Sequence, residues 1–137
     1  ALPILPALCE RAETLTGLLS RSDVISLHCP LTDENRGMIN SEALAHCKRN
    51  AILVNTARGG LIHSESLLAA LRDGTLHSAA LDSFTQEPLT APHLWQSVEN
   101  VVISPHIGGV TDASYIKMGT VAAGNILAVT DATTVSS

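Results

Sequence analysis

The stretch AILVNTARGGLIHSESLLAAL, residues 51–71, decides the fold of this 137-residue chain. It begins with a short apolar run, continues through small residues around Arg58, and ends with leucines at helical spacing. Such a unit of strand, turn and helix is typical of parallel α/β proteins, whose buried strands are short apolar runs. Ligands bind at the carboxyl edge of these sheets, where the loops leave a crevice. The loop of residues 55–60 is therefore the first candidate for a site.

Strands and helices alternate along the rest of the chain in the same way. Apolar runs predict strands at residues 24–28, 51–56, 76–82 and 100–106. Leucine spacing predicts helices before and between them, of which Ser41 and Ser64 cap two and Gly74 ends one. A last helix is predicted from about Thr111 to Val129. The alternation predicts an α/β fold whose parallel sheet is covered by helices on both faces.

Composition and charge limit the function classes. The chain is 45% hydrophobic and 15% charged, which is typical of a packed globular protein and excludes a disordered one. Its net charge of -5 and its 2% aromatic content argue against a nucleic-acid surface, and its sequence has no apolar run of membrane-spanning length. The three cysteines, Cys9, Cys29 and Cys47, lack the spacing of a disulfide framework, so we expect a reducing, cytoplasmic setting.

Parallel crossovers would bring the ends of four strands to one edge of the sheet. Residues 29–30, 56–60, 82 and 105–109 would then form a single candidate site. Within it, Arg58 would grip a substrate carboxylate with its planar guanidinium, while Ala57 and Gly59 would leave room for a ligand. The alternative for Arg58 is an ordinary surface arginine on an exposed loop.

His106 follows the last predicted strand and is the candidate general acid or base, because histidine titrates near neutral pH. Glu87, in the preceding loop, would pair with His106 and fix its tautomer. Asp82 ends a predicted strand and would accept a hydrogen bond from a ligand amide. Each has a structural alternative: a histidine that bonds a turn, a solvated glutamate and a capping aspartate.

Two pairs, His28-Cys29 and His46-Cys47, raise the question of a metal site. The first pair ends a predicted strand, the second ends a short predicted helix, and neither has a recognised ligand spacing. We therefore predict no metal site.

Four segments of the chain carry a family resemblance: SDVISLHCPLTDENRGMIN, AILVNTARGGLIHSESLLAAL, AALDSFTQEPL and NVVISPHIGG. In this order they resemble the carboxyl-terminal signature blocks of the D-isomer-specific 2-hydroxyacid dehydrogenases, and the likeness covers about residues 15–128. It implies the second half of a Rossmann-type NAD(P)-binding domain, with a parallel sheet and a carboxyl-terminal helix. It also implies hydride transfer between NAD(P)H and a 2-oxo acid or D-2-hydroxy acid by a cytoplasmic homodimer.

The resemblance implies a role for each candidate residue. Arg58 would anchor the substrate's carboxylate and carbonyl, His106 would protonate the carbonyl oxygen, and Glu87 would support that histidine. Asp82 would meet the nicotinamide carboxamide. The other residues implied to line NAD or NADP, largely through backbone atoms, are Cys29, Pro30, Thr56, Ala57, Gly108 and Gly109, together with Arg58 and His106.

The chain also departs from the family pattern. It has no G-x-G-x-x-G loop and no acidic ribose-binding residue after a first strand, and Asn50 and Ser83 stand where the family usually has glycine and valine. A βαβ unit takes about 30 residues, more than precede the strand that begins near Asp23. We therefore predict that residues 1–110 are the carboxyl-terminal half of a dinucleotide-binding domain and that residues 111–137 return toward a substrate domain.

Three functional classes are compatible with an α/β chain of this kind. A hydride-transferring dehydrogenase fits best. A hydrolase would need a nucleophile elbow such as G-x-S-x-G, which the sequence lacks. A noncatalytic relic or interaction module that retains the dehydrogenase fold stays open, because candidate catalytic residues do not by themselves establish activity.

Overall fold

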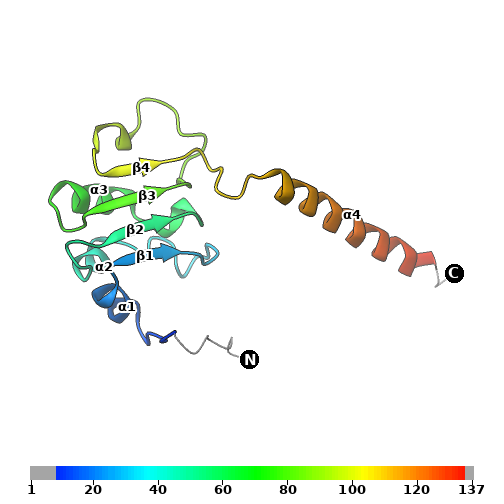
Figure 1. Ribbon diagram of the computed structural model, residues 1–137, viewed down its shortest axis with the longest axis horizontal. Helices are drawn as coiled ribbons and strands as arrows, with labels where there is room; N and C mark the ends of the chain where they lie inside the picture. Colours follow the sequence, from blue (N-terminus) through cyan, green and yellow to red (C-terminus); the bar gives the residue numbers. More distant parts are fainter. Residues whose placement is uncertain (1–8, 135–137) are drawn as a thin grey trace. The chain divides into compact units, whose positions relative to one another are not determined.

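A computed structural model of the chain describes residues 9–134, which form a parallel β-sheet with helices (Figure 1). The strands are β1 (Val24–Leu27), β2 (Ile52–Asn55), β3 (Ser78–Leu81) and β4 (Val101–Ile103). The α-helices are α1 (Leu15–Arg21), α2 (Ser41–Ala45), α3 (Ser64–Arg72) and α4 (Asp112–Thr134), and the short 3₁₀ helices are η1 (Gly59–Leu61) and η2 (Leu94–Ser97). The predicted α/β class is confirmed, and each predicted strand and helix is present.

The four strands lie side by side in the order of the sequence, and all are parallel. In this register Ile25 lies level with Leu53, and Leu53 lies level with Ala79. Each connection moves one strand in the same direction and such crossovers are right-handed, so α2 and α3 fall on the same face. The prediction of a sheet covered on both faces is therefore wrong for the part of the chain that the structure describes.

The two faces of the sheet differ in burial. Toward the covered face point Ile25, Leu53 and Leu81, and none of them is more than 4% exposed. The helices complete this core with the buried residues Leu19, Leu44 and Leu67. The neighbouring strand residues point the other way, and there the exposed apolar residues are Val24 at 59%, Ile52 at 36% and Val102 at 70%.

Two of the predicted helix caps are displaced by one residue. Asn40, not Ser41, caps α2, because its side-chain oxygen accepts a backbone N–H of the first turn at 3.0 Å. His63 precedes α3 without a capping side-chain hydrogen bond, and Ser64 is the first helical residue. Asparagine and serine are similarly favoured as N-caps, so residue preference alone does not distinguish Asn40 from Ser41 as the cap of α2. The predicted stop at Gly74 is confirmed by its left-handed φ of 74°.

The chain divides into two compact units, with the boundary between His106 and Ile107. The second unit contains α4, before which Thr111 accepts the N–H of Ser114 and donates its own N–H to the Ser114 hydroxyl, both at 3.0 Å. This reciprocal cap starts the helix where the sequence predicts it, and α4 continues to Thr134, beyond its predicted end. None of the helices within residues 9–134 is long and apolar enough to cross a membrane.

Candidate functional site

The arrowheads of β1 to β4 point the same way, so the loops that follow the strands share one edge of the sheet (Figure 1). Cys29 and Pro30 follow β1, Thr56 to Arg58 follow β2, Asp82 follows β3, and Pro105 and His106 follow β4. The predicted convergence of these strand ends is confirmed. Gly108 and Gly109, also predicted to line a cofactor, belong to the second unit, and their role stays a prediction.

Glu87 and His106 form a hydrogen-bonded pair at this edge. His106 Nδ1 lies 2.7 Å from Glu87 Oε2, and Glu87 Oε1 accepts the N–H of Phe84 at 2.8 Å. One carboxylate oxygen is therefore held by the ring and the other by the loop backbone. The pairing predicted from the sequence is confirmed, and it leaves Nε2 as the ring nitrogen that can meet a ligand.

The backbone at His106 lies in the left-handed region, with a φ of 56°. An L-residue is strained there, although histidine adopts this region more often than most side chains. The N–H of His106 donates to the carbonyl of Ser104 at 3.0 Å, so the chain bends sharply after β4. Strained residues cluster at functional sites, where the surrounding structure holds them in place. The contact with Glu87 is one such restraint.

Several neighbours lower the pKa of the Glu87 carboxyl below its ordinary value. The hydrogen bond from His106 contributes most, the bond from the Phe84 N–H comes next, and the charges of His106 and Arg58 add to both against the opposing effect of burial. A lowered pKa keeps the carboxylate ionised through the neutral range, so it can accept a hydrogen bond from the Nδ1–H of the imidazole.

Arg58 lies in the turn between β2 and η1, and its side chain is exposed. Its guanidinium donates to the carbonyl of Ala57 at 2.7 Å. Since a guanidinium carries five N–H donors in a planar fork, this bond occupies a minor part of its capacity. The geometry suits bidentate binding of a carboxylate.

Asn55 was not predicted as a site residue, yet it holds the loop that carries Arg58. It is fully buried at the end of β2. Its side-chain oxygen accepts the N–H of Ala57 at 3.0 Å, and its side-chain amide donates to the carbonyl of Arg58 at 2.9 Å. The available signal was an amide side chain ending an apolar strand, because a buried amide needs hydrogen-bond partners.

Gly59 brings the loop after β2 against the loop after β3. A Cβ atom at this position would overlap the backbone of Phe84 and Thr85, so no larger residue fits this approach. Phe84 in turn donates its N–H to Glu87. The close approach at Gly59 therefore connects the loop of Arg58 with the loop of Glu87.

Asp82 is 5% exposed, and its Oδ1 accepts a hydrogen bond from Ser104 Oγ at 2.6 Å. Ser104 is a second residue that the sequence did not single out. The two residues meet because of the register of the sheet. Leu81 pairs with Ile103, so Asp82 and Ser104, which follow them, lie level with each other. Register is a property of strand pairing, which the sequence alone did not specify.

An open pocket of about 410 Å³ lies beside the pair of Glu87 and His106. Its walls are formed by Phe84, Glu87, Pro88, Leu89, Pro105 and His106. The volume is in the range of small-molecule sites, about 300 to 1,000 Å³. Apolar side chains therefore form most of the wall beside the hydrogen-bonded pair of Glu87 and His106.

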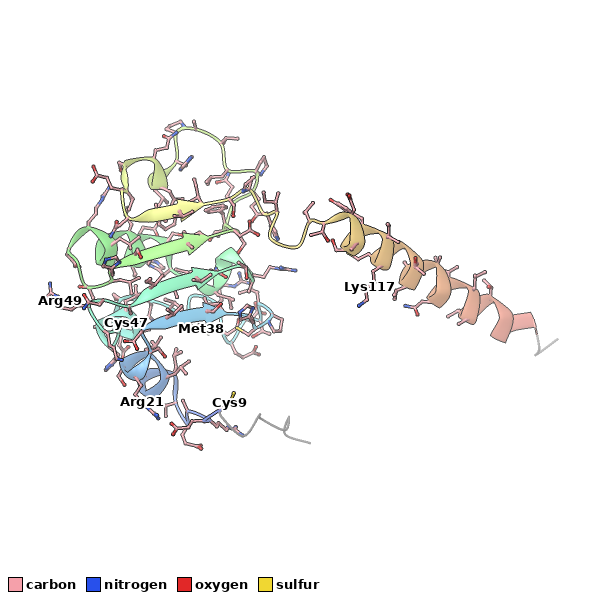
Figure 2. All side chains as sticks on the ribbon, viewed as in Figure 1. Cys9, Arg21, Met38, Cys47, Arg49 and Lys117 are labelled. Atoms are coloured by element: carbon pink, nitrogen blue, oxygen red, sulfur yellow. The ribbon has the colours of Figure 1, made fainter. Side chains whose placement is uncertain are left out.

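The three cysteines are free thiols, and Figure 2 labels Cys9 near α1 and Cys47 after α2. Burial raises the pKa of the Cys47 thiol, which makes it less reactive. His28 is hydrogen-bonded through Nε2 to Ser26 Oγ at 2.8 Å. Among residues 9–134, no group of three or more His, Cys, Asp or Glu side chains is arranged to hold a metal ion.

The chain matches the model of the D-isomer specific 2-hydroxyacid dehydrogenase, NAD binding domain, over residues 6–108. It is 44% identical over 117 residues to the (S)-sulfolactate dehydrogenase of Chromohalobacter salexigens, and 44% identical over 115 residues to a glyoxylate reductase of Thermofilum pendens. The two alignments cover 85% and 84% of this chain but 38% and 34% of the two relatives. The chain therefore spans little more than a third of their length.

Two similar structures contain a cofactor. The D-isomer specific 2-hydroxyacid dehydrogenase of Xanthobacter autotrophicus Py2, in complex with NADPH and MES, has 39% identity and a TM-score of 0.67, with 71% of this chain and 40% of that chain covered. The one of Lactobacillus delbrueckii ssp. bulgaricus, in its NAD complexed form, has 30% identity and a TM-score of 0.79, with 87% and 40% covered. Since the family match over residues 6–108 includes all four strands of the parallel sheet, the chain belongs to the D-isomer specific 2-hydroxyacid dehydrogenase family, in its NAD-binding domain.

Proposed function

We propose that the protein to which this chain belongs is an NAD(P)-dependent oxidoreductase that interconverts a 2-oxo acid and a D-2-hydroxy acid, with His106 as general acid and base. The observation that supports this most directly is the 2.7 Å contact between His106 Nδ1 and Glu87 Oε2 beside an open pocket. Acid–base catalysis needs a proton donor of fixed tautomer, and a carboxylate on Nδ1 provides it.

Arg58, His106 and Glu87 each have a separate role in the proposed reduction. Arg58 binds the carboxylate of the 2-oxo acid through parallel hydrogen bonds. The hydride for the carbonyl carbon would come from NAD(P)H held at this edge of the sheet. His106 transfers a proton from Nε2 to the carbonyl oxygen, and the ionised carboxylate of Glu87 stabilises the imidazolium before that transfer. In the direction of oxidation, His106 accepts the proton.

The edge of the sheet suits a nicotinamide cofactor. Thr56 and Ala57 present small side chains after β2, and the buried Asp82 holds acceptor oxygens after β3 for a carboxamide. The other residues that we propose to line the dinucleotide are Cys29, Pro30, Arg58, His106, Gly108 and Gly109. Similar structures hold NADPH and NAD, so the proposal covers both cofactors.

The substrate that we propose is a small 2-oxo or 2-hydroxy acid, since the relatives are named for sulfolactate and glyoxylate. Residues 1–110 would be the carboxyl-terminal half of the dinucleotide-binding domain, and residues 111–137 would lead toward a substrate domain. We further propose a cytoplasmic homodimer, which sedimentation of the whole protein would check.

The activity is tested by following NAD(P)H oxidation by the whole protein with glyoxylate, hydroxypyruvate and a panel of other small 2-oxo acids. Nicotinamide fluorescence measures cofactor binding in the same samples. We expect binding together with turnover of at least one acid. Binding without any turnover would favour the alternative, a noncatalytic relic or interaction module that retains the dehydrogenase fold.

A further inference from the structure

Asn55 stands where β2 becomes the loop of Arg58, and it bonds in three directions. Its backbone carbonyl accepts the N–H of Asp82 at 2.9 Å, which fixes it to the neighbouring strand end. Its side chain accepts the N–H of Ala57 at 3.0 Å and donates to the carbonyl of Arg58 at 2.9 Å. One residue therefore connects the edge of the sheet to the backbone on both sides of the peptide between Ala57 and Arg58.

The chemistry of these contacts requires an amide. The side chain must accept at one end and donate at the other, and it must be short enough to reach a loop two and three residues ahead. An ionised aspartate has the same shape but only accepts, so it would face the Arg58 carbonyl with a like partial charge. Because Asn55 is 0% exposed, water cannot replace a lost partner, and the loop must move to satisfy its own groups.

The same loop also has a fixed relation to the acid–base pair. Gly59 approaches the backbone of Phe84 and Thr85 so closely that a Cβ atom would overlap it. The N–H of Phe84 holds Glu87, and Glu87 holds His106. A shift of the loop at Arg58 would therefore separate the carboxylate-binding group from the proton donor.

From this geometry we infer that Asn55 is the positioning residue for Arg58: its buried amide sets where the guanidinium meets the substrate carboxylate. The inference rests on the proposed function and adds a residue that does not itself touch the substrate. It requires that replacing Asn55 lowers activity only when Arg58 is present.

A double-mutant cycle in the whole protein tests this requirement. The variants are Asn55→Ala, Arg58→Ala and the two combined, with glyoxylate as substrate and nicotinamide fluorescence for cofactor binding. We expect Asn55→Ala to lower kcat/KM by about tenfold or more, because a buried hydrogen-bonding group is lost, and to raise KM for glyoxylate. In the Arg58→Ala background, adding Asn55→Ala should lower kcat/KM no further. An equal loss in both backgrounds, or no loss at all, would overturn the inference.

Two further variants separate positioning from stability. Leu76→Ala removes a fully buried side chain at the turn between α3 and β3 and lowers the melting temperature, but should leave kcat/KM near that of the wild type. Asn55→Asp keeps the shape of the side chain and replaces Asn55→Ala in the cycle if the latter does not fold. A loss of activity in Leu76→Ala as large as that in Asn55→Ala would make stability the explanation and remove the positioning role.

Hydrogen exchange in the unmodified protein provides a test that needs neither variants nor activity. The N–H of Ala57 should exchange slowly because Asn55 accepts it, although it lies in a loop. Fast exchange at Ala57 would overturn the positioning role. If no 2-oxo acid is turned over but Ala57 is protected, the proposed function fails while the hold of Asn55 on the loop stands.

Discussion

The loop after β2 and the segment after β4 each present one proposed catalytic side chain, and they hold it in opposite ways. Arg58 is positioned through its backbone, which the buried Asn55 fixes on both sides. His106 has a strained backbone with a φ of 56°, and its side chain is held by Glu87. Arg58 therefore depends on the buried Asn55, which holds its loop, and His106 depends on the side chain of Glu87.

The difference fits the role that we propose for each group. The long side chain of an arginine can adjust when its guanidinium binds a carboxylate. Its backbone position therefore needs to be fixed more than its guanidinium does. An imidazole that transfers a proton needs its ring orientation and tautomer fixed, and that requires a partner on Nδ1. The side chains of His106 and Glu87 are 43% and 35% exposed, so their pair contributes little to stability and mainly sets orientation.

The largest effect is expected from His106→Asn in the whole protein. Asparagine tolerates the left-handed backbone at this position but cannot act as an acid or base at neutral pH. We expect kcat to fall about 10²- to 10⁴-fold, with cofactor affinity retained. Steady-state rates with glyoxylate or hydroxypyruvate and nicotinamide fluorescence measure the two quantities.

His77→Asn is the matched control for that variant, because His77 is exposed and directly precedes β3, at the opposite edge of the sheet. It should keep the activity of the unmodified protein. If His106→Asn retains near-normal turnover, His106 is not the acid, and the contrast between the two loops loses its functional meaning.

Arg58→Lys is expected to have the next largest effect. The frame around Asn55 stays intact, but lysine lacks the planar fork that binds a carboxylate through two hydrogen bonds. We expect a higher KM for the oxo acid and a lower kcat, together about 10- to 100-fold in kcat/KM, which corresponds to one lost charge-assisted hydrogen bond. Unchanged substrate kinetics would return Arg58 to the class of ordinary surface arginines.

The titration of Glu87 tests how the side chain of His106 is held. The fold lowers the pKa of Glu87, chiefly through the hydrogen bond from His106. The pair therefore stabilises the folded protein at pH values above the ordinary pKa of a glutamate. This stabilisation is lost as the pH falls through the lowered pKa. Carbon-13 NMR of the Glu87 carboxyl should give a pKa below the ordinary value, with the loss of stability confined to pH values below the ordinary pKa of a glutamate. In His106→Asn the pKa should rise, and a pKa that does not move would mean that His106 is not the partner that holds Glu87.

The smallest effect concerns Ser83, which directly follows Asp82 in the segment after β3. It is 3% exposed, and within the part of the chain that the structure describes its hydroxyl has no hydrogen-bond partner. Ser83→Val, the residue usual in the family, and the smaller Ser83→Ala should each raise the free energy of unfolding by about 1 kcal/mol, because a buried unpaired hydroxyl is removed. Urea unfolding of the whole protein measures this. Destabilisation by both variants would show that the hydroxyl is satisfied after all.

The sequence was most informative where a chemical requirement is carried by a single side chain. The pair of Glu87 and His106 was predicted from residue type and from the family's order of motifs, and the structure brings the two side chains together. Asn55 and Ser104 were missed because their importance depends on neighbours that the fold supplies. A buried amide or hydroxyl is meaningful only once its partners are known.

The sequence by itself determined the alternation of strands and helices, and with it the α/β class and the convergence of Arg58, Asp82 and His106 at one edge. These follow from hydrophobic spacing, which acts within a few residues. Only the tertiary structure decided that the helices between the strands cover one face of the sheet, that Gly59 joins two loops, and that Asn55 holds the loop of Arg58. These depend on strand order, register and the handedness of the crossovers, which bring together residues far apart in the chain.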